Sequence, residues 1–296
     1  MPEAPLCLLQ VHAHPDDEAS KGAGTTAKYH AEGVRTVLVT CTGGEAGDIL
    51  NPAADTPEVR ERLHEVRMEE LAESVRVLGY DALHMLGYHD SGMPDTEVNH
   101  RPDNFANAPL DEAVGRFVKI IRQERPQVII TYREDREFYP HPDHIRVFEI
   151  SGPAFDAAGD PDQYPDAGEP WQPSKLYYVS WSAARIKALH AAYLERGEES
   201  PYERWFEGGR FDRDRDDFTT LIDVGDFLTK RREALLAHRT QVDPSGFWMR
   251  LPDEVIRQVF PWEEFTLARS LVDTNRQPGE FEDDLFAGLR ETARRS

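Results

Sequence analysis

Two short segments of the 296-residue chain concentrate side chains that could bind a metal ion. They are residues 12–18, with the sequence HAHPDDE, and residues 141–144, with the sequence HPDH. Placing so many ionisable groups near a protein core is unfavourable unless they pair with one another or bind a cation. Histidine nitrogen and carboxylate oxygen together are typical ligands of catalytic zinc, which keeps one position for water. The two segments therefore predict a metal site that activates water.

A purely structural role is the alternative for the acidic residues of these segments, because Asp is a favoured helix N-cap. Capping accounts for Asp17 or Asp143 taken singly. It does not account for two clusters of His and Asp that follow different strands. The metal interpretation is therefore preferred.

Both segments lie directly after a predicted strand, in a chain whose strands and helices alternate. Short apolar runs predict strands at residues 6–11, 36–40, 83–86, 128–132 and 176–181. Apolar residues at helical spacing predict helices at residues 20–30, 59–78 and 110–121. This order is typical of the α/β class, in a Rossmann-like, mostly parallel sheet with helices on both faces.

The predicted sheet gives the polar segments a common location. In an open parallel sheet, ligands bind beyond the carboxyl ends of the strands. Polar residues follow four of the predicted strands, at positions 14–18, 43–45, 89–91 and 139–144. We therefore expect these side chains to line one crevice.

The alternation of strands and helices fades after about residue 181. Helices are predicted at residues 182–196 and 226–238, joined by charged or aromatic-rich loops. We expect a single domain over residues 1–296, with a metal-binding α/β core at 1–181. The C-terminal part, residues 182–296, is expected to be helical or irregular and to cover the mouth of the active site.

Charge and composition argue against nucleic acid and membranes as binding partners. The 55 Asp and Glu residues outnumber the 34 Lys and Arg residues, and the net charge of -21 opposes binding to nucleic acid or to an anionic membrane. No apolar stretch approaches the ~18 residues of a membrane span, and the N-terminus lacks a signal-peptide pattern. Cys7 and Cys41 lie in predicted buried strands and are expected to be reduced, without a disulfide. We expect a cytoplasmic protein with a small-molecule partner, and its oligomeric state stays open.

A non-catalytic nucleotide-binding module is the alternative from a different functional class. Residues 22–27, with the sequence GAGTTA, faintly resemble a dinucleotide-binding fingerprint. These glycines follow an acidic run that would oppose a pyrophosphate, and they begin several residues after the strand, within the predicted helix. The enzyme interpretation is therefore preferred.

The two clusters, together with residues 40–45 (TCTGGE) and 90–92 (DSG), resemble the LmbE-like (PIG-L) zinc-dependent de-N-acetylases. The likeness runs nearly end to end. It extends to four further segments, at residues 20–22, 47–52, 237–244 and 283–288. A likeness over the whole chain is much more specific than the two clusters alone.

The resemblance implies the ligands of the metal and the general base. His14, Asp17 and His144 would hold zinc, and iron is an alternative metal for the same ligands. Asp16 would be the general base that takes a proton from the attacking water and returns it to the leaving amine. A metal of this kind activates water for attack on an amide carbonyl.

The resemblance also assigns catalytic roles to the second cluster. His141 would stabilise the developing oxyanion, and Asp143 would orient His141. Tyr139 matches a mobile active-site tyrosine and would face the same oxyanion. An aromatic ring packed under its loop is the alternative for Tyr139.

Four residues are implied as substrate contacts. Arg67 and Asp90 match positions that hold sugar and inositol hydroxyls, and Glu45 would support the metal site. For Arg67 the alternative is a salt bridge to Glu70 on the same helix. Lys21 matches a lysine associated with the larger substrates of an amidase-like branch, and its alternative is a solvated helix lysine.

The implied reaction is hydrolysis of the glucosaminyl amide bond of mycothiol S-conjugates. Its products are a mercapturic acid and glucosaminyl-inositol, which is a thiol-dependent detoxification step. The alternative is removal of acetate from N-acetylglucosaminyl-inositol, or de-N-acylation of another amino-sugar or natural product. One departure from the family bears on this choice, since residues 133–138 (REDREF) are more charged and bulkier than the glycine-containing loop expected there.

Overall fold

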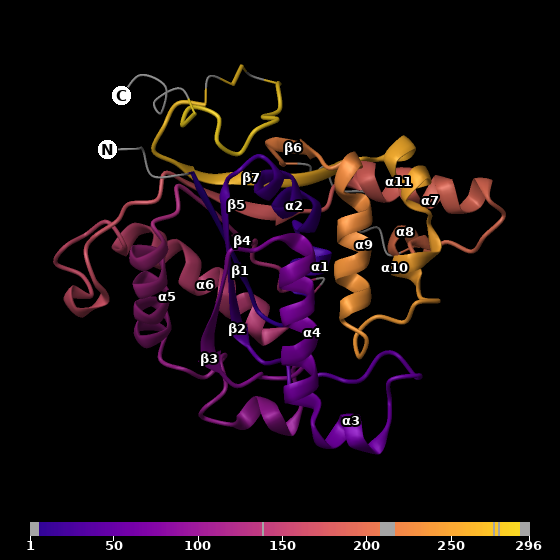
Figure 1. Ribbon diagram of the computed structural model, residues 1–296, viewed down its shortest axis with the longest axis horizontal. Helices are drawn as coiled ribbons and strands as arrows, with labels where there is room; N and C mark the ends of the chain where they lie inside the picture. Colours follow the sequence, from indigo (N-terminus) through magenta and orange to yellow (C-terminus); the bar gives the residue numbers. More distant parts are fainter. Residues whose placement is uncertain (1–5, 138, 208–216, 275, 278, 291–296) are drawn as a thin grey trace.

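The computed structural model describes residues 6–137, 139–207, 217–274, 276–277 and 279–290. In this part of the chain, a seven-stranded sheet has the order β3-β2-β1-β4-β5-β7-β6 (Figure 1). Strands β1 to β5 are parallel, and β7 runs antiparallel to both of its neighbours. The strands are β1 Cys7–His12, β2 Arg35–Thr42, β3 Ala82–Tyr88, β4 Val128–Tyr132, β5 Lys175–Ser180, β6 Thr220–Asp223 and β7 Trp262–Ser270.

Helices cover both faces of the sheet (Figure 1). Helices α5 and α6 pack on one face, and α2, α4 and α9 pack on the other. The helices are α1 Asp17–Ser20, α2 Ala23–Ala31, α3 Pro57–Glu61, α4 Leu63–Leu78, α5 Leu110–Glu124, α6 Pro142–Ala157, α7 Ala183–Glu195, α8 Glu203–Glu207, α9 Leu228–Ala237, α10 Phe247–Arg250 and α11 Asp253–Val259. Short 3-10 helices are η1 Glu97–His100, η2 Pro165–Ala167 and η3 Gly225–Phe227.

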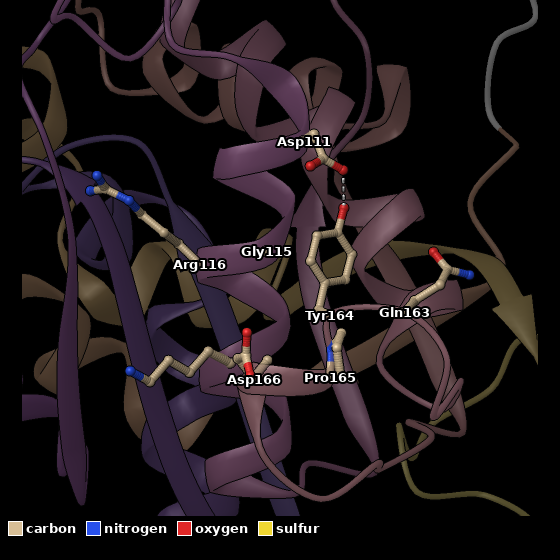
Figure 2. A pocket seen from close by; sticks show the side chains of 9 residues that line it. Asp111, Gly115, Arg116, Gln163, Tyr164, Pro165 and Asp166 are labelled. Atoms are coloured by element: carbon tan, nitrogen blue, oxygen red, sulfur yellow. Dashed lines mark hydrogen bonds between the residues drawn. The ribbon is translucent and has the colours of Figure 1, made fainter.

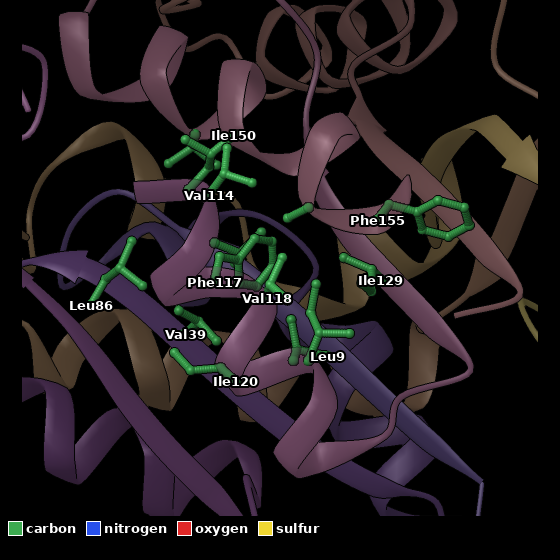
Figure 3. Close-up of a cluster of buried hydrophobic side chains, with 14 of the residues drawn as sticks. Leu9, Val39, Leu86, Val114, Phe117, Val118, Ile120, Ile129, Ile150 and Phe155 are labelled. Carbon is green, nitrogen blue, oxygen red and sulfur yellow. The ribbon is translucent and has the colours of Figure 1, made fainter. Parts of the chain in front are cut away.

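Strand β1 shows why the sheet needs helices on both faces. Its side chains alternate, so that Leu9 and Val11 join the core beneath α5 and α6 while Leu8 joins the core on the other face. Phe117 and Val118 of α5 pack against the first of these cores (Figure 3). Every residue of β1 is buried, as expected for a central parallel strand. The α/β fold expected from the sequence is confirmed.

The boundaries of two predicted helices differ from the structure. The helix expected at 20–30 is interrupted before α2, because Gly22 has a φ of 83° and a side chain there would meet Gln10 at 2.9 Å. The helix expected at 59–78 is divided into α3 and α4 at Arg62, whose φ and ψ are -115° and 25°. As a result α3 has no buried residue, whereas α4 buries Leu71 and Leu78.

Strands β6 and β7 were not expected from the sequence. The polar pair Glu263 and Glu264 interrupts the apolar pattern of β7, although both side chains are buried. Glu263 accepts hydrogen bonds from the backbone N–H groups of Gly24 and Thr25, and so satisfies the start of α2. Because these two carboxylates break the apolar pattern, β7 could not be predicted from the sequence.

The structure also bears on two expectations from composition. Cys7 and Cys41 are buried free thiols. Among the described residues, every helix is too short or too polar to cross a bilayer.

A buried ion pair anchors the segment after β7 against the sheet. Lys175 Nζ lies 2.9 Å from Glu282 Oε1, and both side chains are almost fully buried. Glu282 also accepts hydrogen bonds from the Tyr177 hydroxyl and the Thr220 hydroxyl. The segment around Glu282 is therefore held by polar contacts inside the protein.

Replacing Glu282 with Ala should lower the free energy of unfolding by roughly 3–5 kcal/mol, because the Lys175 ammonium would stay buried without its carboxylate. Urea denaturation followed by circular dichroism measures this change. Glu73, which pairs with Arg76 on an exposed helix face, provides the control. Its replacement by Ala should leave the transition midpoint unchanged, and an equal midpoint for the Glu282 variant would contradict the anchoring role.

Candidate active site

The polar residues expected in one crevice come together at the carboxyl ends of the parallel strands. His14 follows β1, Asp90 follows β3, and His144 lies in the first turn of α6 after β4. The His14 Nε2 atom is 3.1 Å from Asp143 Oδ2 and 3.6 Å from Asp90 Oδ1. The His144 Nε2 atom is 3.3 Å from Asp17 Oδ2. Three strand ends thus meet at one point.

The first turns of α1 and α6 fix these side chains. Pro142 occupies the first turn of α6, where its fixed φ suits a helix start. His141 caps α6, because its Nδ1 atom accepts a hydrogen bond from the backbone N–H of Asp143 at 3.2 Å. In α1, Asp17 Oδ2 accepts a hydrogen bond from the backbone N–H of His14 at 3.0 Å. Both helix starts therefore face the same point.

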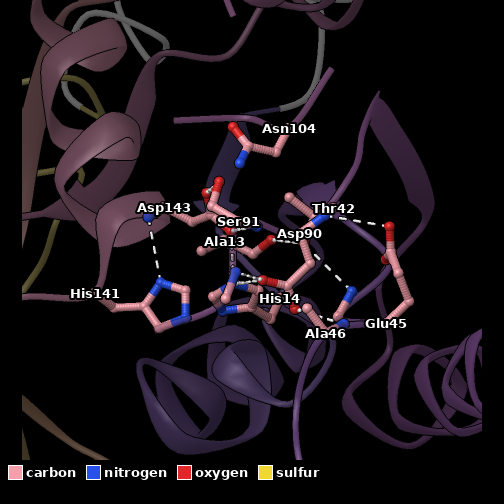
Figure 4. A network of polar contacts seen from close by, with 12 residues as sticks. Ala13, His14, Thr42, Glu45, Ala46, Asp90, Ser91, Asn104, His141 and Asp143 are labelled. Atoms are coloured by element: carbon pink, nitrogen blue, oxygen red, sulfur yellow. Dashed lines mark hydrogen bonds and ion pairs between the residues drawn. The ribbon is translucent and has the colours of Figure 1, made fainter. Parts of the chain in front are cut away.

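Two overlapping groups of side chains could each hold a metal ion, and His14 belongs to both. Within each group the potential ligand atoms lie within 4.8 Å of one another. Figure 4 shows His14 beside the carboxylates of the second group. The first group is His14, Asp17 and His144, and the second is His14, Asp90, His141 and Asp143.

The charges around His14 fit a bound cation. Burial opposes a positive charge on this ring, but its contacts with Asp143, Asp17 and Asp90 outweigh burial and raise the pKa of His14 well above its usual value. A single imidazolium would still leave these buried carboxylates with a net negative charge. A divalent metal ion would compensate that charge more fully.

His144 has the properties of a metal ligand. Burial lowers its pKa to about 3, so the ring is neutral and keeps a lone pair. Its buried Nε2 atom forms no hydrogen bond of good geometry among the described residues, although Asp17 Oδ2 lies 3.3 Å away. A buried polar atom without a partner is unfavourable, and a metal ion would satisfy it. The residues present therefore fit the metal that the sequence predicts.

Asp16 lies beside the first group and is held in a strained conformation. Its φ of 111° is rare for a residue with a side chain, and strain of this kind is common at functional sites. The backbone N–H of Asp16 donates a hydrogen bond to Glu18 Oε2 at 2.9 Å. Burial raises the pKa of Asp16, while the nearby Arg67 opposes this effect. Asp16 is thus positioned by its neighbours on both sides.

Arg67 contacts the backbone of the active-site loops. Its guanidinium donates hydrogen bonds to the carbonyls of Gly44 and Pro15, and it lies 3.1 Å from Asp16 Oδ2. The helical salt bridge to Glu70 is absent from the contacts of the described residues, because Glu70 accepts hydrogen bonds from Thr240 instead. Only 3% of the Arg67 side chain is exposed, so its observed partners are loop carbonyls and Asp16.

A buried network behind Asp16 was not predicted from the sequence. Glu18 accepts a hydrogen bond from Ser74, and its Oε1 atom lies 2.5 Å from His238 Nε2. Glu18 and His238 are fully buried. The His238 segment was noticed only through the family resemblance, since a lone histidine in a helix-ending segment gives no local signal of such a contact. The network ties α9 to the loop that carries Asp16.

Lys21 and Tyr139 flank the first group of ligands. The Lys21 Nζ atom is 2.5 Å from Asp17 Oδ1, so the lysine is not simply a solvated helix residue. The ring of Tyr139 lies 4.8 Å from that of His144, edge to face, and 46% of the residue is exposed. Tyr139 is therefore not packed beneath its loop but stands next to His144.

Asp90 and Glu45 lie on the β2 and β3 side of the ligands. Asp90 accepts hydrogen bonds from the backbone N–H groups of Ala46 and Gly92. Glu45 accepts hydrogen bonds from the backbone N–H of Asp90 and from His89. These contacts link the two loops that follow β2 and β3 beside His14.

The Asp143 side chain was expected to orient His141, but in the structure it contacts other groups. Its carboxylate interacts with His14 and with the backbone N–H and hydroxyl of Ser91 rather than with the His141 ring. The backbone N–H of Asp143 is the group that holds His141, through the Nδ1 atom. Ser91 is a second contact that the sequence analysis did not identify, although it lies within the DSG segment.

A cavity of about 660 Å³ opens beside the first group of ligands. Asp16, Asp17, Lys21, Tyr139 and His144 line one part of it. The remainder is formed by Ser20, Leu50, residues 132–135, the end of β5 and the chain from Trp181 onward. The C-terminal part, which was expected to cover the mouth of the site, contributes Trp205, Leu235 and Trp248 to this lining.

The charged loop that departs from the family pattern borders the same cavity. Arg133, Glu134 and Asp135 contribute to its lining. Arg133 Nη2 lies 2.6 Å from Asp217 Oδ2, and Arg136 pairs with Glu134 and Glu149. Phe138, the last residue of the predicted loop, lies outside the described residues.

A separate cavity of about 640 Å³ lies between α5 and η2 (Figure 2). Gly115 and Arg116 of α5 line it together with Tyr164, whose hydroxyl donates a hydrogen bond to Asp111 at 2.7 Å. Its lining includes none of the residues that the sequence analysis selected. The predicted site residues therefore lie at the strand ends and not in this second cavity.

Comparison with known proteins identifies the family. The family model described as GlcNAc-PI de-N-acetylase (PIG-L) matches residues 9–155. The mycothiol S-conjugate amidase of Streptomyces coelicolor is 47% identical over 295 residues, which cover 97% of this chain and 99% of that protein. This chain belongs to the PIG-L family. The family resemblance found in the sequence is thereby confirmed.

This PIG-L family member is also similar to a second named relative and to a solved structure. The 1D-myo-inositol 2-acetamido-2-deoxy-alpha-D-glucopyranoside deacetylase of Streptomyces avermitilis is 37% identical over 293 residues, covering 95% of this chain and 97% of that protein. The solved structure of N,N'-diacetylchitobiose deacetylase from Pyrococcus horikoshii superposes with a TM-score of 0.61 at 19% identity. It covers 88% of this chain and 83% of that chain. The structural match supports the fold of this PIG-L family member.

The alternative of a nucleotide-binding module is not supported by the start of α2. A dinucleotide pyrophosphate would bind the free N–H groups at such a helix start. The N–H groups of Gly24 and Thr25 already donate to Glu263, at 3.1 and 2.9 Å. An internal carboxylate therefore occupies the place that a phosphate would need.

Replacing His144 with Ala should abolish stoichiometric zinc binding, because one of the three proposed ligands is removed. Zinc content after dialysis, measured by inductively coupled plasma mass spectrometry, gives the result. His84→Ala is the matched control, since His84 pairs with Glu124 away from the site. The His141→Ala variant should keep its zinc, and loss of zinc from this variant alone would assign the metal to the second group.

Proposed function

We propose that the protein is a zinc-dependent amidohydrolase that cleaves the glucosaminyl amide bond of mycothiol S-conjugates. The products are a mercapturic acid and glucosaminyl-inositol. One observation supports the chemistry most directly, namely that Asp16 stands beside the group His14, Asp17 and His144 at the edge of a cavity of about 660 Å³. The 47% identity to a mycothiol S-conjugate amidase along nearly the whole chain supports the substrate.

The metal ligands and Asp16 would have different roles in the reaction. A zinc ion held by His14, Asp17 and His144 would supply a Lewis acid and lower the pKa of a water molecule. Asp16 would take the proton of the attacking water and deliver it to the leaving amine. Its raised pKa suits a group that must carry a proton between two steps. Arg67 and Glu18 would hold Asp16 in position, as positioning residues.

His141 would stabilise the oxyanion as a neutral hydrogen-bond donor. Burial and the neighbouring His14 lower the pKa of His141, so the ring is neutral. Its Nδ1 atom accepts a hydrogen bond from Asp143, so the proton resides on Nε2 and can be donated. Tyr139, whose ring lies 6.1 Å from the ring of His141, would donate its hydroxyl to the same oxygen.

The residues on the β2 and β3 side would bind the sugar. Asp90 and Glu45 present carboxylate oxygens, which accept hydrogen bonds from hydroxyl groups. Arg67, also expected as a sugar contact, would act there only through Asp16, because its guanidinium is buried against loop carbonyls. Lys21, on the cavity side, would face the acyl group.

This reaction would serve detoxification, since it releases the adduct of a thiol and an electrophile as a mercapturic acid. We place the enzyme in the cytoplasm, where the reduced thiols of Cys7 and Cys41 would be maintained. The cavity is sized for a small molecule, and the net charge of -21 disfavours nucleic acid.

Replacing Asp16 with Asn should lower kcat by roughly 10²–10⁴-fold, because the proton carrier is lost. Bound zinc should be unchanged, since Asp16 lies outside the proposed ligands. Steady-state kinetics with parallel zinc analysis measure both effects. Asp95→Asn is a matched control, because Asp95 also has a positive φ, of 67°, but is exposed away from the cavity. Near-normal turnover by the Asp16 variant would exclude it as the general base.

The zinc-loaded protein should release a mercapturic acid from a mycothiol S-conjugate faster than it releases acetate from N-acetylglucosaminyl-inositol. Mass spectrometry of products from the two substrates, assayed side by side, tests this expectation. Preferential release of acetate would instead make the protein a deacetylase, as its 37% identical relative is named. Removal of the metal with a chelator should stop both reactions.

A further inference from the structure

The cavity beside the ligands has a second wall, made of aromatic side chains, that the proposed mechanism does not use. Trp181, Trp205, Phe247 and Trp248 line this part of the cavity. We call these four residues the aromatic wall. The apolar side chains of Leu235 and Val242 are nearby in the same lining. Catalysis of amide hydrolysis alone requires no such surface.

The aromatic wall is a packed unit. The rings of Trp181 and Trp248 lie 5.9 Å apart, edge to face, and the ring of Trp205 lies 6.5 Å from that of Trp181. Behind them, the guanidinium of Arg185 lies 4.7 Å from the Trp181 ring, and that of Arg231 lies 5.5 Å from the Trp248 ring. A surface held in this way is already shaped before a ligand binds.

The order of strands separates this wall from the polar residues suited to a sugar. Asp90 follows β3 and Glu45 follows β2, on one side of the central strands β1 and β4. Trp181 directly follows β5, on the other side of β1 and β4. The proposed zinc ligands, which follow β1 and β4, lie between these two sides. A substrate with its amide at the ligands would therefore place its two ends in chemically different surroundings.

We propose that the aromatic wall is the subsite for the sulfur-linked group of the conjugate, and that it selects aromatic and other bulky apolar groups. This inference rests on the proposed function. In a mycothiol S-conjugate, the cleaved carbonyl belongs to the cysteine, and the sulfur is only two carbon atoms further along the chain. With the glucosaminyl group on the side of Asp90, the sulfur-linked group extends toward Trp181 and Trp248. Burial of a phenyl-sized group there favours binding by roughly ten- to a hundred-fold.

The test compares the zinc-loaded wild type with two variants of the wall, Trp248→Ala and Phe247→Ala. The second variant guards against misfolding, because Phe247 is 38% exposed. Kinetics with S-benzyl and S-methyl mycothiol give the ratio of kcat/KM for the two conjugates. The wild-type ratio should be at least about tenfold in favour of S-benzyl, and each variant should lower it several-fold. Trp262→Ala, in a tryptophan outside the cavity lining, should keep the wild-type ratio.

A binding measurement separates failure of the subsite from failure of the proposed function. Isothermal titration with S-benzyl-N-acetylcysteine and S-methyl-N-acetylcysteine requires no turnover. Tighter binding of the benzyl compound that Trp248→Ala removes would support the subsite even if neither conjugate were hydrolysed. Hydrolysis of both conjugates at equal efficiency, unchanged in the wall variants, would overturn the subsite and leave the amidase function standing.

Discussion

The structure of the active site depends on one buried imidazole that faces several buried carboxylates. His14 lies within reach of Asp17, Asp90 and Asp143, and all four side chains are nearly inaccessible to water. Bringing these groups together without a compensating cation is unfavourable, because buried like charges repel one another and lose their hydration. The fold tolerates this arrangement because a metal ion can resolve it. The carboxylates that the fold gathers at the strand ends therefore favour binding of a cation beside His14.

The two sides of the sheet around His14 present different kinds of side chain. Strands β2 and β3 end in carboxylates tied to backbone N–H groups, which suits hydroxyl-bearing ligands. Strand β5 ends at Trp181, beside aromatic rings contributed by the C-terminal part of the chain. Strand β7 joins that part to the sheet and satisfies the start of α2 through Glu263. In the proposed function, the order of the strands would give the two ends of a substrate different surroundings, and the residues after β1 and β4 would carry out the reaction.

Sequence reasoning found the parallel half of the fold and the cluster around His14, because both depend on local patterns. Apolar runs marked β1 to β5, and strand ends rich in His and Asp marked the site. Reasoning from local patterns failed where partners are distant in the chain. The carboxylates of Glu263 and Glu264 concealed β7, and the contact between Glu18 and His238 joins residues 220 positions apart. The link from Asp143 to His141 runs through the backbone, which residue types alone do not reveal.

Two groups of potential ligands share His14, so the roles proposed for the surrounding residues depend on which group holds the metal. Crystals of the zinc-loaded protein, measured with X-rays at the zinc absorption edge, would locate the ion from its anomalous scattering. We expect a single peak within about 2.0–2.2 Å of ligand atoms of His14, Asp17 and His144. A peak bound instead by Asp90, His141 and Asp143 would contradict it, because His141 would then be a ligand and could not stabilise the oxyanion.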